Sequence, residues 1–264
     1  MEANPRDNSL TLIALGVLSF TLADSTHEAL GHGLATLAVG GTPVLLTSSY
    51  FNASGHYSRW IPAAGGIANV AVGLLALGCT RLARKAAPAW LYFLILLASF
   101  NLLFAAAYPF YSGAALFGDW AAVIAGLAPA WLWRAVLIAG SVSLYWLFLS
   151  WLADAIHPFR GVNGRASLDR LQRITLIPFL SALVIACIAG AFNPRGWINI
   201  LVAAAPAAAA SFGITQLDHF RAALISDPDS PLAGPIPLSP AWIAAAGLAA
   251  VLFVAFLGPG IRFH

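Results

Sequence analysis

Charged residues are scarce in this chain. They make up 9% of its 264 residues and Lys85 is the only lysine, whereas roughly a quarter of the residues of a soluble protein are charged. Apolar residues make up 60%, and the mean hydropathy is +0.83. These proportions exclude an ordinary soluble domain. The apolar runs are continuous and do not alternate with polar residues, which argues against a β-barrel and predicts an all-α polytopic membrane protein.

The chain also has few cysteines and a small net charge. The two cysteines, Cys79 and Cys187, lie in apolar segments, where small buried side chains explain them better than a disulfide or a metal site. The net charge is +3, and the basic residues are spread over short loops, as orientation signals are in membrane proteins. We therefore expect a lipid bilayer as a partner and no nucleic acid.

Long apolar segments predict about seven transmembrane helices. They are expected at about 9–39, 62–82, 88–107, 131–153, 174–192, 197–214 and 241–258. Residues 41–60 hold β-branched and aromatic residues between turn residues, which predicts a small β-hairpin at the membrane surface after the first helix. Residues 108–118 are expected to form a loop.

Residues 119–130 are apolar but too short to cross a bilayer. They are expected to form a re-entrant or in-plane segment, or the first turns of the next helix, interrupted at Pro129. We expect one structural unit, in which residues 1–130 form a core of three spans and this short segment, and residues 131–264 form a four-helix membrane region. Basic residues are more numerous on the side of the N-terminus, which predicts a multi-pass plasma (inner) membrane protein with a cytoplasmic N-terminus.

The first predicted span contains a cluster of titratable residues. Asp24, His27, Glu28 and His32 lie in a run that is otherwise apolar. A charged side chain near the bilayer centre costs at least ~2.5–3.5 kcal/mol, so such a cluster needs partners, a water-filled cavity or a metal. Histidine and glutamate together suggest a zinc hydrolase, in which neutral imidazoles bind the metal and the glutamate takes a proton from the water that the metal activates.

The spacing within this cluster differs from the well-known zinc-hydrolase arrangement. That arrangement has histidines at i and i+4, whereas His27 and His32 are five residues apart and would lie roughly 140° apart on a regular helix. A π-bulge would bring the two imidazoles together and keep Glu28 as the base. Alternatively, Asp24, Glu28 and His32 form an i, i+4, i+8 stripe that could bind a metal on a regular helix. In a third arrangement, these groups only satisfy one another inside the bundle.

Other polar residues are expected on the same, non-cytoplasmic side as His32. Asn69 lies in the first turns of the second span, Asn101 in the last third of the third span, and Asp119 after the loop that follows. Asp119 is the best candidate for a third ligand, and an N-cap of residues 120–128 explains it equally well. Asn69 and Asn101 are more often hydrogen-bond partners between helices than ligands.

Three motifs follow one another along the first half of the chain. They are His27-Glu28…Gly31-His32, then Ala64-Gly65-Gly66-Ile67-Ala68-Asn69, then Asn101-Leu-Leu followed by Pro109 and Gly118-Asp119. In content and order they resemble the site-2 protease family of intramembrane zinc metalloproteases, which has a zinc-binding helix followed by a small membrane-surface sheet. The resemblance implies His27, His32 and Asp119 as ligands of Zn²⁺ and Glu28 as general base. It also implies that Gly66, Asn69 and Asn101 support the core or the substrate.

The chain departs from the family's pattern in three ways. One extra residue separates the histidines, Gly118 precedes Asp119 where the family has a glycine after its aspartate, and the interval from Asn101 to Asp119 is longer. If the motif is aligned backwards from His32, Glu28 falls at the first ligand position and alanine at the base position. That alignment would leave an inactive site.

Three functions remain open, and a metal-dependent intramembrane hydrolase is preferred. It would be a zinc protease that cleaves a membrane-embedded peptide or protein substrate. The alternative is a catalytically inactive protease-like membrane protein that binds or chaperones other membrane segments, which the extra residue in the motif favours. A transporter or proton relay is the weakest hypothesis, because the last three spans contain almost no ionisable residues.

Overall fold

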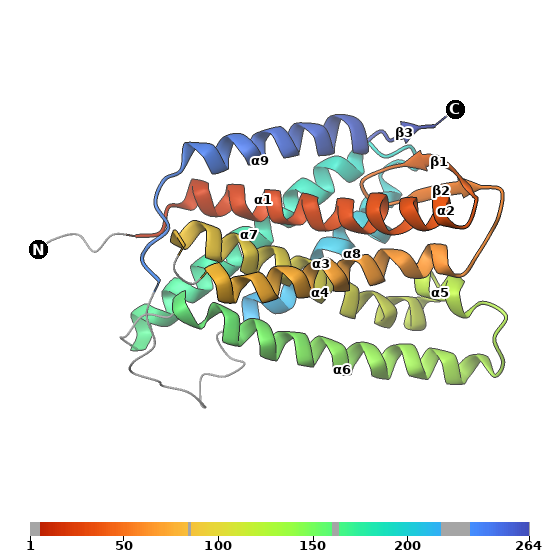
Figure 1. Ribbon diagram of the computed structural model, residues 1–264, viewed down its shortest axis with the longest axis horizontal. Coiled ribbons are helices and arrows are strands. Elements are labelled where there is room, and N and C mark those ends of the chain that lie inside the picture. The colour runs from red at the N-terminus through yellow and green to blue at the C-terminus, as the bar shows by residue number, and fades with distance from the viewer. Residues whose placement is uncertain (1–5, 84–85, 160–163, 218–232, 264) are drawn as a thin grey trace, which may run out of the picture.

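Helices make up most of the structure. In the computed structural model, which describes residues 6–83, 86–159, 164–217 and 233–263, six helices are long and apolar enough to cross a membrane. They are Ser9–Ala38, Trp60–Leu82, Pro88–Ala115, Ala130–Phe159, Leu168–Ala191 and Pro240–Leu257. Figure 1 shows the long helices lying side by side along the long axis of the molecule. The predicted all-α polytopic membrane fold is confirmed, and the protein is an integral membrane protein.

The first span consists of three consecutive helical elements. They are α1 (Ser9–Ser25), the π-helix η1 (Thr26–Gly33) and α2 (Leu34–Ala38). The span begins after Asn8, whose side-chain oxygen accepts the backbone N–H of Thr11 at 3.1 Å and so caps the helix. The remaining helices are α3 (Trp60–Leu82), α4 (Pro88–Ala115), α5 (Asp119–Ile124), α6 (Ala130–Ile156), η3 (His157–Phe159), α7 (Gly164–Ala191), η4 (Ile200–Ala204), α8 (Ala205–Ala209), η5 (Ala210–Gln216), α9 (Pro240–Leu252) and η6 (Phe253–Leu257).

A shorter helix stands where a span at 197–214 was expected. The apolar segment Ile200–Gln216 is continuous but changes from π-helix to α-helix to 3-10 helix along its length. At ~1.5 Å per residue, its 17 residues are shorter than the ~30 Å of a hydrocarbon core. This segment therefore fills space between the spans, and it lines the cavity described below.

The third span is longer than predicted. Residues 108–115 were expected in a loop, but α4 continues through Pro109 to Ala115 and ends where Leu116 takes a left-handed conformation with φ 54°. A proline is tolerated inside a membrane helix when neighbouring helices satisfy nearby carbonyl groups. The hydroxyl group of Ser141 in α6 donates to the carbonyl oxygen of Ala106, one turn before the proline. This helix is the centre of the bundle, because 78% of its most apolar window is buried.

The predicted hairpin is present after the first span. Strands β1 (Thr42–Leu46) and β2 (Phe51–Ser54) pair antiparallel. A third strand, β3 (Ile261–Arg262), adds to the other side of β1, so that the sheet order is β2-β1-β3 and the C-terminal end of the chain is tied to the hairpin. The two residues of β3 are too few for a strand pattern to reveal them in the sequence.

The segment predicted at 119–130 is a separate short helix. The helix α5 ends at Ile124, a turn follows, and α6 begins at Ala130. It packs against α3 and α4 and lies beside the end of α6 (Figure 1). The first helix, α1, packs against both α7 and α9, so the predicted core and the C-terminal region are in direct contact.

Candidate metal centre

The π-helix η1 brings two histidines of the first span together. Its i→i+5 hydrogen bonding places residues five apart on one face. The ring centroids of His27 and His32 are therefore 4.7 Å apart, with the planes nearly perpendicular. The π-bulge that was one of three alternatives is confirmed as the local geometry. The stripe of Asp24, Glu28 and His32 presumed a regular helix, and that premise is wrong for residues 26–33.

The third residue of this cluster comes from α5. Oδ2 of Asp119 lies 2.9 Å from Nε2 of His27 and 3.1 Å from Nε2 of His32. Asp119 is the first residue of α5, and Gly118 occupies the N-cap position, so the interpretation of Asp119 as the N-cap is wrong. Gly118 has φ +83°, and a Cβ there would lie 2.5 Å from the hydroxyl oxygen of Tyr108. The glycine before the aspartate is thus required to turn Asp119 toward the histidines.

Each imidazole is oriented through its other ring nitrogen. Nδ1 of His27 lies 2.7 Å from Oδ1 of Asn69, and Nδ1 of His32 lies 2.7 Å from the carbonyl oxygen of Ile61. The amide of Asn69 is itself fixed, since its Nδ2 donates to the carbonyl oxygen of Ala23 and to Oδ1 of Asn101. Both partners can only accept, so Nδ1 is the donor in both rings. The two asparagines predicted to support the core therefore hold one histidine in place.

These hydrogen bonds leave three acceptors facing one point. With Nδ1 protonated, Nε2 of each neutral imidazole presents a lone pair, and both Nε2 atoms lie against the same oxygen of Asp119. A positive charge between these atoms, from a protonated imidazole or from a metal ion, would stabilise the arrangement. Protonation of both imidazoles would place two positive charges on buried rings 4.7 Å apart. A single metal ion satisfies all three atoms at once.

The donor set suits zinc. Two histidine nitrogens and a carboxylate oxygen are the ligand types of a catalytic zinc site, and histidine ligands usually donate their second N–H to a carbonyl or carboxylate, as both do here. Ligand atoms of a tetrahedral zinc site lie roughly 3.3 Å apart. The observed separations of 2.9 and 3.1 Å need to widen by only a few tenths of an ångström. Burial raises the pKa of Asp119, whereas the imidazoles of His32 and His27 lower it. The imidazoles have the larger effect, so this pKa lies well below its ordinary value.

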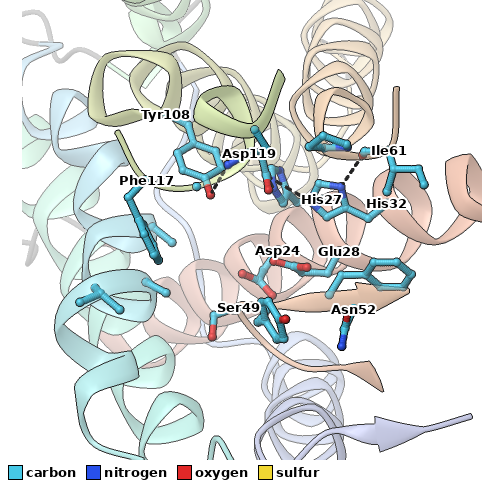
Figure 2. Close-up of a pocket in the computed structure, with 18 of the residues that line it drawn as sticks. Asp24, His27, Glu28, His32, Ser49, Asn52, Ile61, Tyr108, Phe117 and Asp119 are labelled. Atoms are coloured by element: carbon cyan, nitrogen blue, oxygen red, sulfur yellow. Dashed lines mark hydrogen bonds and ion pairs between the residues drawn. The ribbon is translucent and has the colours of Figure 1, made fainter. Parts of the chain in front are cut away.

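Two further carboxyl groups lie in the same cavity. Ligand atoms of Glu28, His27 and His32 all lie within 4.8 Å of one another, whereas Asp24 lies outside this group. Among the described residues, Oε2 of Glu28 and Oδ2 of Asp24 are buried and have no hydrogen-bond partner. Figure 2 shows both side chains pointing into the cavity. Glu28 therefore has one oxygen available beside the paired histidines.

The glycines of α3 permit the close approach of this helix to η1. A Cβ on Gly65 would lie 2.6 Å from Nε2 of His27 and 2.8 Å from Cε1 of His32, and a Cβ on Gly31 would lie 2.5 Å from Cα of Gly65. A Cβ on Gly66, which was predicted to support the core or the substrate, would lie 3.3 Å from the indole ring of Trp120. The role of Gly65 was not predicted, although the adjacent Gly65-Gly66 pair in the first turns of a span was a signal of close packing.

A cavity of about 630 Å³ opens from the cluster. One wall of the cavity is formed by η1, by α5 and by residues 49–57, which contain β2. A second wall comes from the C-terminal half of the chain. The residues from this second wall are Arg195, Val202, Ala203, Pro206, Ala207, Ala209 and Ala210. The sequence did not predict these residues, because all except Arg195 are small apolar residues of an alanine-rich segment, which carry no signal of a site.

Comparison of the chain with protein-family models, with curated proteins and with solved structures gave no match. The resemblance to site-2 proteases therefore stays an inference from the three motifs. The structure itself brings His27, His32 and Asp119 together and leaves Oε2 of Glu28 without a hydrogen-bond partner.

Proposed function

We propose that the protein is a metal-dependent intramembrane hydrolase, and specifically a zinc protease distantly related to the site-2 proteases. The observation that carries the proposal is the convergence of two imidazole nitrogens and one carboxylate oxygen on a single point, with both imidazoles held in the tautomer that binds metal. This convergence joins His27 and His32 of the first span to Asp119, which lies 92 and 87 positions later in the chain.

In this proposal His27, His32 and Asp119 hold the zinc ion. Bound zinc would supply Lewis-acid activation of a water molecule and of a peptide carbonyl group. Asn69 and Ile61 orient the two imidazoles, and Asn101 fixes the amide of Asn69. The loss of such an orienting partner typically costs 10–100-fold in metal affinity.

Glu28 is assigned the role of general base. Its carboxylate lies beside the histidines, and Oε2 is free to accept a proton from the attacking water and to deliver it to the leaving amine. Glu28 is adjacent in sequence to His27, so the π-helix that pairs the histidines also fixes the position of the carboxylate.

The proposed substrate is a membrane-embedded peptide or protein segment. The cavity beside Glu28 lies among helices long enough to span the bilayer, and much of its lining is apolar or aromatic. Phe104, Tyr108, Tyr111 and Phe117 line it together with the alanine-rich wall. A cavity of this size and character suits apolar side chains next to a peptide bond that is being hydrolysed.

The alternative function is that of an inactive protein that binds other membrane segments. The extra residue between the histidines favoured this alternative, because it would separate their rings on a regular helix. The π-helix absorbs that residue, so the alternative loses its main support. It predicts partner binding that does not depend on Glu28 or on zinc.

The test measures zinc content and peptide cleavage in purified protein. Wild-type protein is expected to hold stoichiometric zinc and to cleave an apolar transmembrane peptide that is detected by mass spectrometry. Glu28→Gln should keep zinc and lose cleavage, whereas His32→Ala and Asp119→Asn should lose both. His56→Ala is the matched control, since His56 lines the cavity but lies outside the cluster and is exposed. Wild-type protein without stoichiometric zinc would refute the proposal.

We also propose a plasma (inner) membrane location with a cytoplasmic N-terminus, from the distribution of basic residues. A single cysteine at Ser54, an exposed hairpin residue, is then expected to react with a membrane-impermeant maleimide in intact cells. Cys79 and Cys187 are replaced beforehand. Labelling of Ser54→Cys only after permeabilisation would contradict this orientation.

A further inference from the structure

The cavity has a single arginine or lysine among its lining residues in the described part of the chain. Arg195 lies in the loop between α7 and η4, outside the region that resembles the site-2 proteases. Its guanidinium carbon lies 3.4 Å from the centre of the Tyr50 ring, which is a close cation–π contact. The tyrosine is also a lining residue, and it follows β1 in the hairpin turn. The stacked guanidinium therefore forms part of the cavity surface.

The loop that carries Arg195 is held in place by two buried asparagines. Oδ1 of Asn193 accepts the backbone N–H of Arg195 at 3.0 Å, and Nδ2 of Asn193 donates to the hydroxyl oxygen of Thr47 at 3.1 Å. Nδ2 of Asn199 donates to the hydroxyl oxygen of Ser49 at 2.8 Å. Both asparagines are almost fully buried. The backbone on either side of the arginine is thus fixed to the hairpin, which preorganises the guanidinium for binding.

The guanidinium group has no acidic partner among the described residues. Its nitrogens form no ion pair and no hydrogen bond there, and its one close contact is the stacking on Tyr50. Asp24 and Glu28 line the same cavity and have free oxygens, yet neither forms a hydrogen bond or an ion pair with it, and Arg195 acts on Glu28 only through a longer-range charge interaction. A stacked guanidinium presents its N–H groups edge-on, in a geometry that matches a carboxylate. The positive charge is therefore available to a ligand.

We propose that Arg195 is a specificity-determining residue that binds a carboxylate carried by an apolar peptide segment in the cavity. The apolar and aromatic lining accepts the segment, and the arginine pairs with its single negative charge. The carboxylate is either the C-terminus of the segment or the side chain of an acidic residue, since both present the same group. This inference rests on the proposed function for the peptide nature of the ligand, but the pairing itself requires neither zinc nor cleavage.

The test compares matched peptide pairs on the full chain in lipid nanodiscs. One pair of fluorescent leucine-alanine peptides ends in a carboxylate or a carboxamide, and a second pair carries an internal glutamate or glutamine with an amidated end. Binding is measured with zinc present and after chelation. Wild-type protein should bind the anionic member of at least one pair ~10-fold more tightly, as expected for a charge-assisted hydrogen bond. The pair that shows the difference identifies the source of the carboxylate.

Variants decide whether the arginine is responsible. Arg195→Gln should remove the preference, and Arg195→Lys should retain part of it, because lysine keeps the charge and loses the planar fork. Arg262→Gln is the matched control, since Arg262 is exposed on the neighbouring strand β3 and does not line the cavity. Equal binding of both members of each pair by wild-type protein, or a preference that survives in Arg195→Gln, would overturn the inference. A preference that persists in protein shown to hold no zinc would separate this inference from the proposed protease.

Discussion

A methyl group at Gly65 is expected to disrupt the candidate metal centre by displacing an imidazole, although every proposed ligand is still present. The Cβ of Gly65→Ala would lie 2.6 Å from Nε2 of His27, whereas ordinary contacts of a Cβ begin at 3.4 Å. The ring or the helix must therefore move by about 0.8 Å. The rings cannot yield freely, because each is hydrogen-bonded through Nδ1, and α3 already touches η1 at Gly31. A displacement of this size should weaken zinc binding at least as much as the loss of an orienting partner, by ~10–100-fold.

The assay is a competition for zinc between the protein and a chromogenic chelator, with the melting temperature of the metal-free protein measured alongside. Gly78→Ala is the matched control, because Gly78 lies on the same helix and a Cβ there meets nothing within 4 Å. That variant should bind zinc like wild type and be slightly more stable, since alanine favours a helix by ~0.5–1 kcal/mol over glycine. If folded Gly65→Ala binds zinc as tightly as Gly78→Ala, the inferred contact between α3 and the imidazoles is wrong.

Three further predictions concern the π-helix, the orienting asparagine and the ion pair of Asp7 with Arg170. Deletion of Leu30, a half-exposed residue of η1, should convert the π-helix to an α-helix with histidines at i and i+4. Zinc binding should be preserved in this variant, and a folded deletion variant that has lost zinc would contradict the prediction. Asn69→Ala should lower zinc affinity ~10–100-fold in the chelator competition, because His27 loses its acceptor, and an unchanged affinity would refute the orienting role. Nε of Arg170 lies 2.8 Å from Oδ2 of Asp7 in an ion pair whose carboxylate is buried and whose guanidinium is partly exposed. Arg170→Gln breaks this pair and should lower the free energy of unfolding by about 2–3 kcal/mol in a denaturant titration, with the zinc content unchanged, and an unchanged free energy of unfolding would refute the contribution of the pair.

Much of the fold could be predicted from composition and hydrophobic runs. Five of the long helices and the hairpin lie close to their expected positions, because apolar length is the dominant signal in lipid. The end of α4 was misplaced because proline and glycine usually interrupt helices in water, whereas here a serine of α6 satisfies a carbonyl group near Pro109. The strand β3 depends on a contact with β1 that is distant in sequence and too short to leave a pattern.

The residues of the candidate metal site could be predicted, but the local geometry could not. The types and order of His27, Glu28, His32 and Asp119 were sufficient to suggest a zinc site. The choice between a π-helix and a regular helix depends on tertiary contacts, since α3 approaches η1 only where glycines allow it. The roles of Gly65 and Arg195 were missed for the same reason. Each acts through a contact between segments far apart in the chain, and neither belongs to a residue pattern with a known chemistry.

The proposed function requires that one zinc ion is held between the first span and α5. X-ray absorption at the zinc edge of purified, zinc-loaded protein identifies the atoms that bind the ion. We expect imidazole scattering from His27 and His32 at ~2.0–2.1 Å, together with an oxygen ligand that Asp119→Asn weakens or removes. A wild-type spectrum without imidazole scattering, or one that does not change in the Asp119→Asn and His32→Ala variants, would contradict the claim.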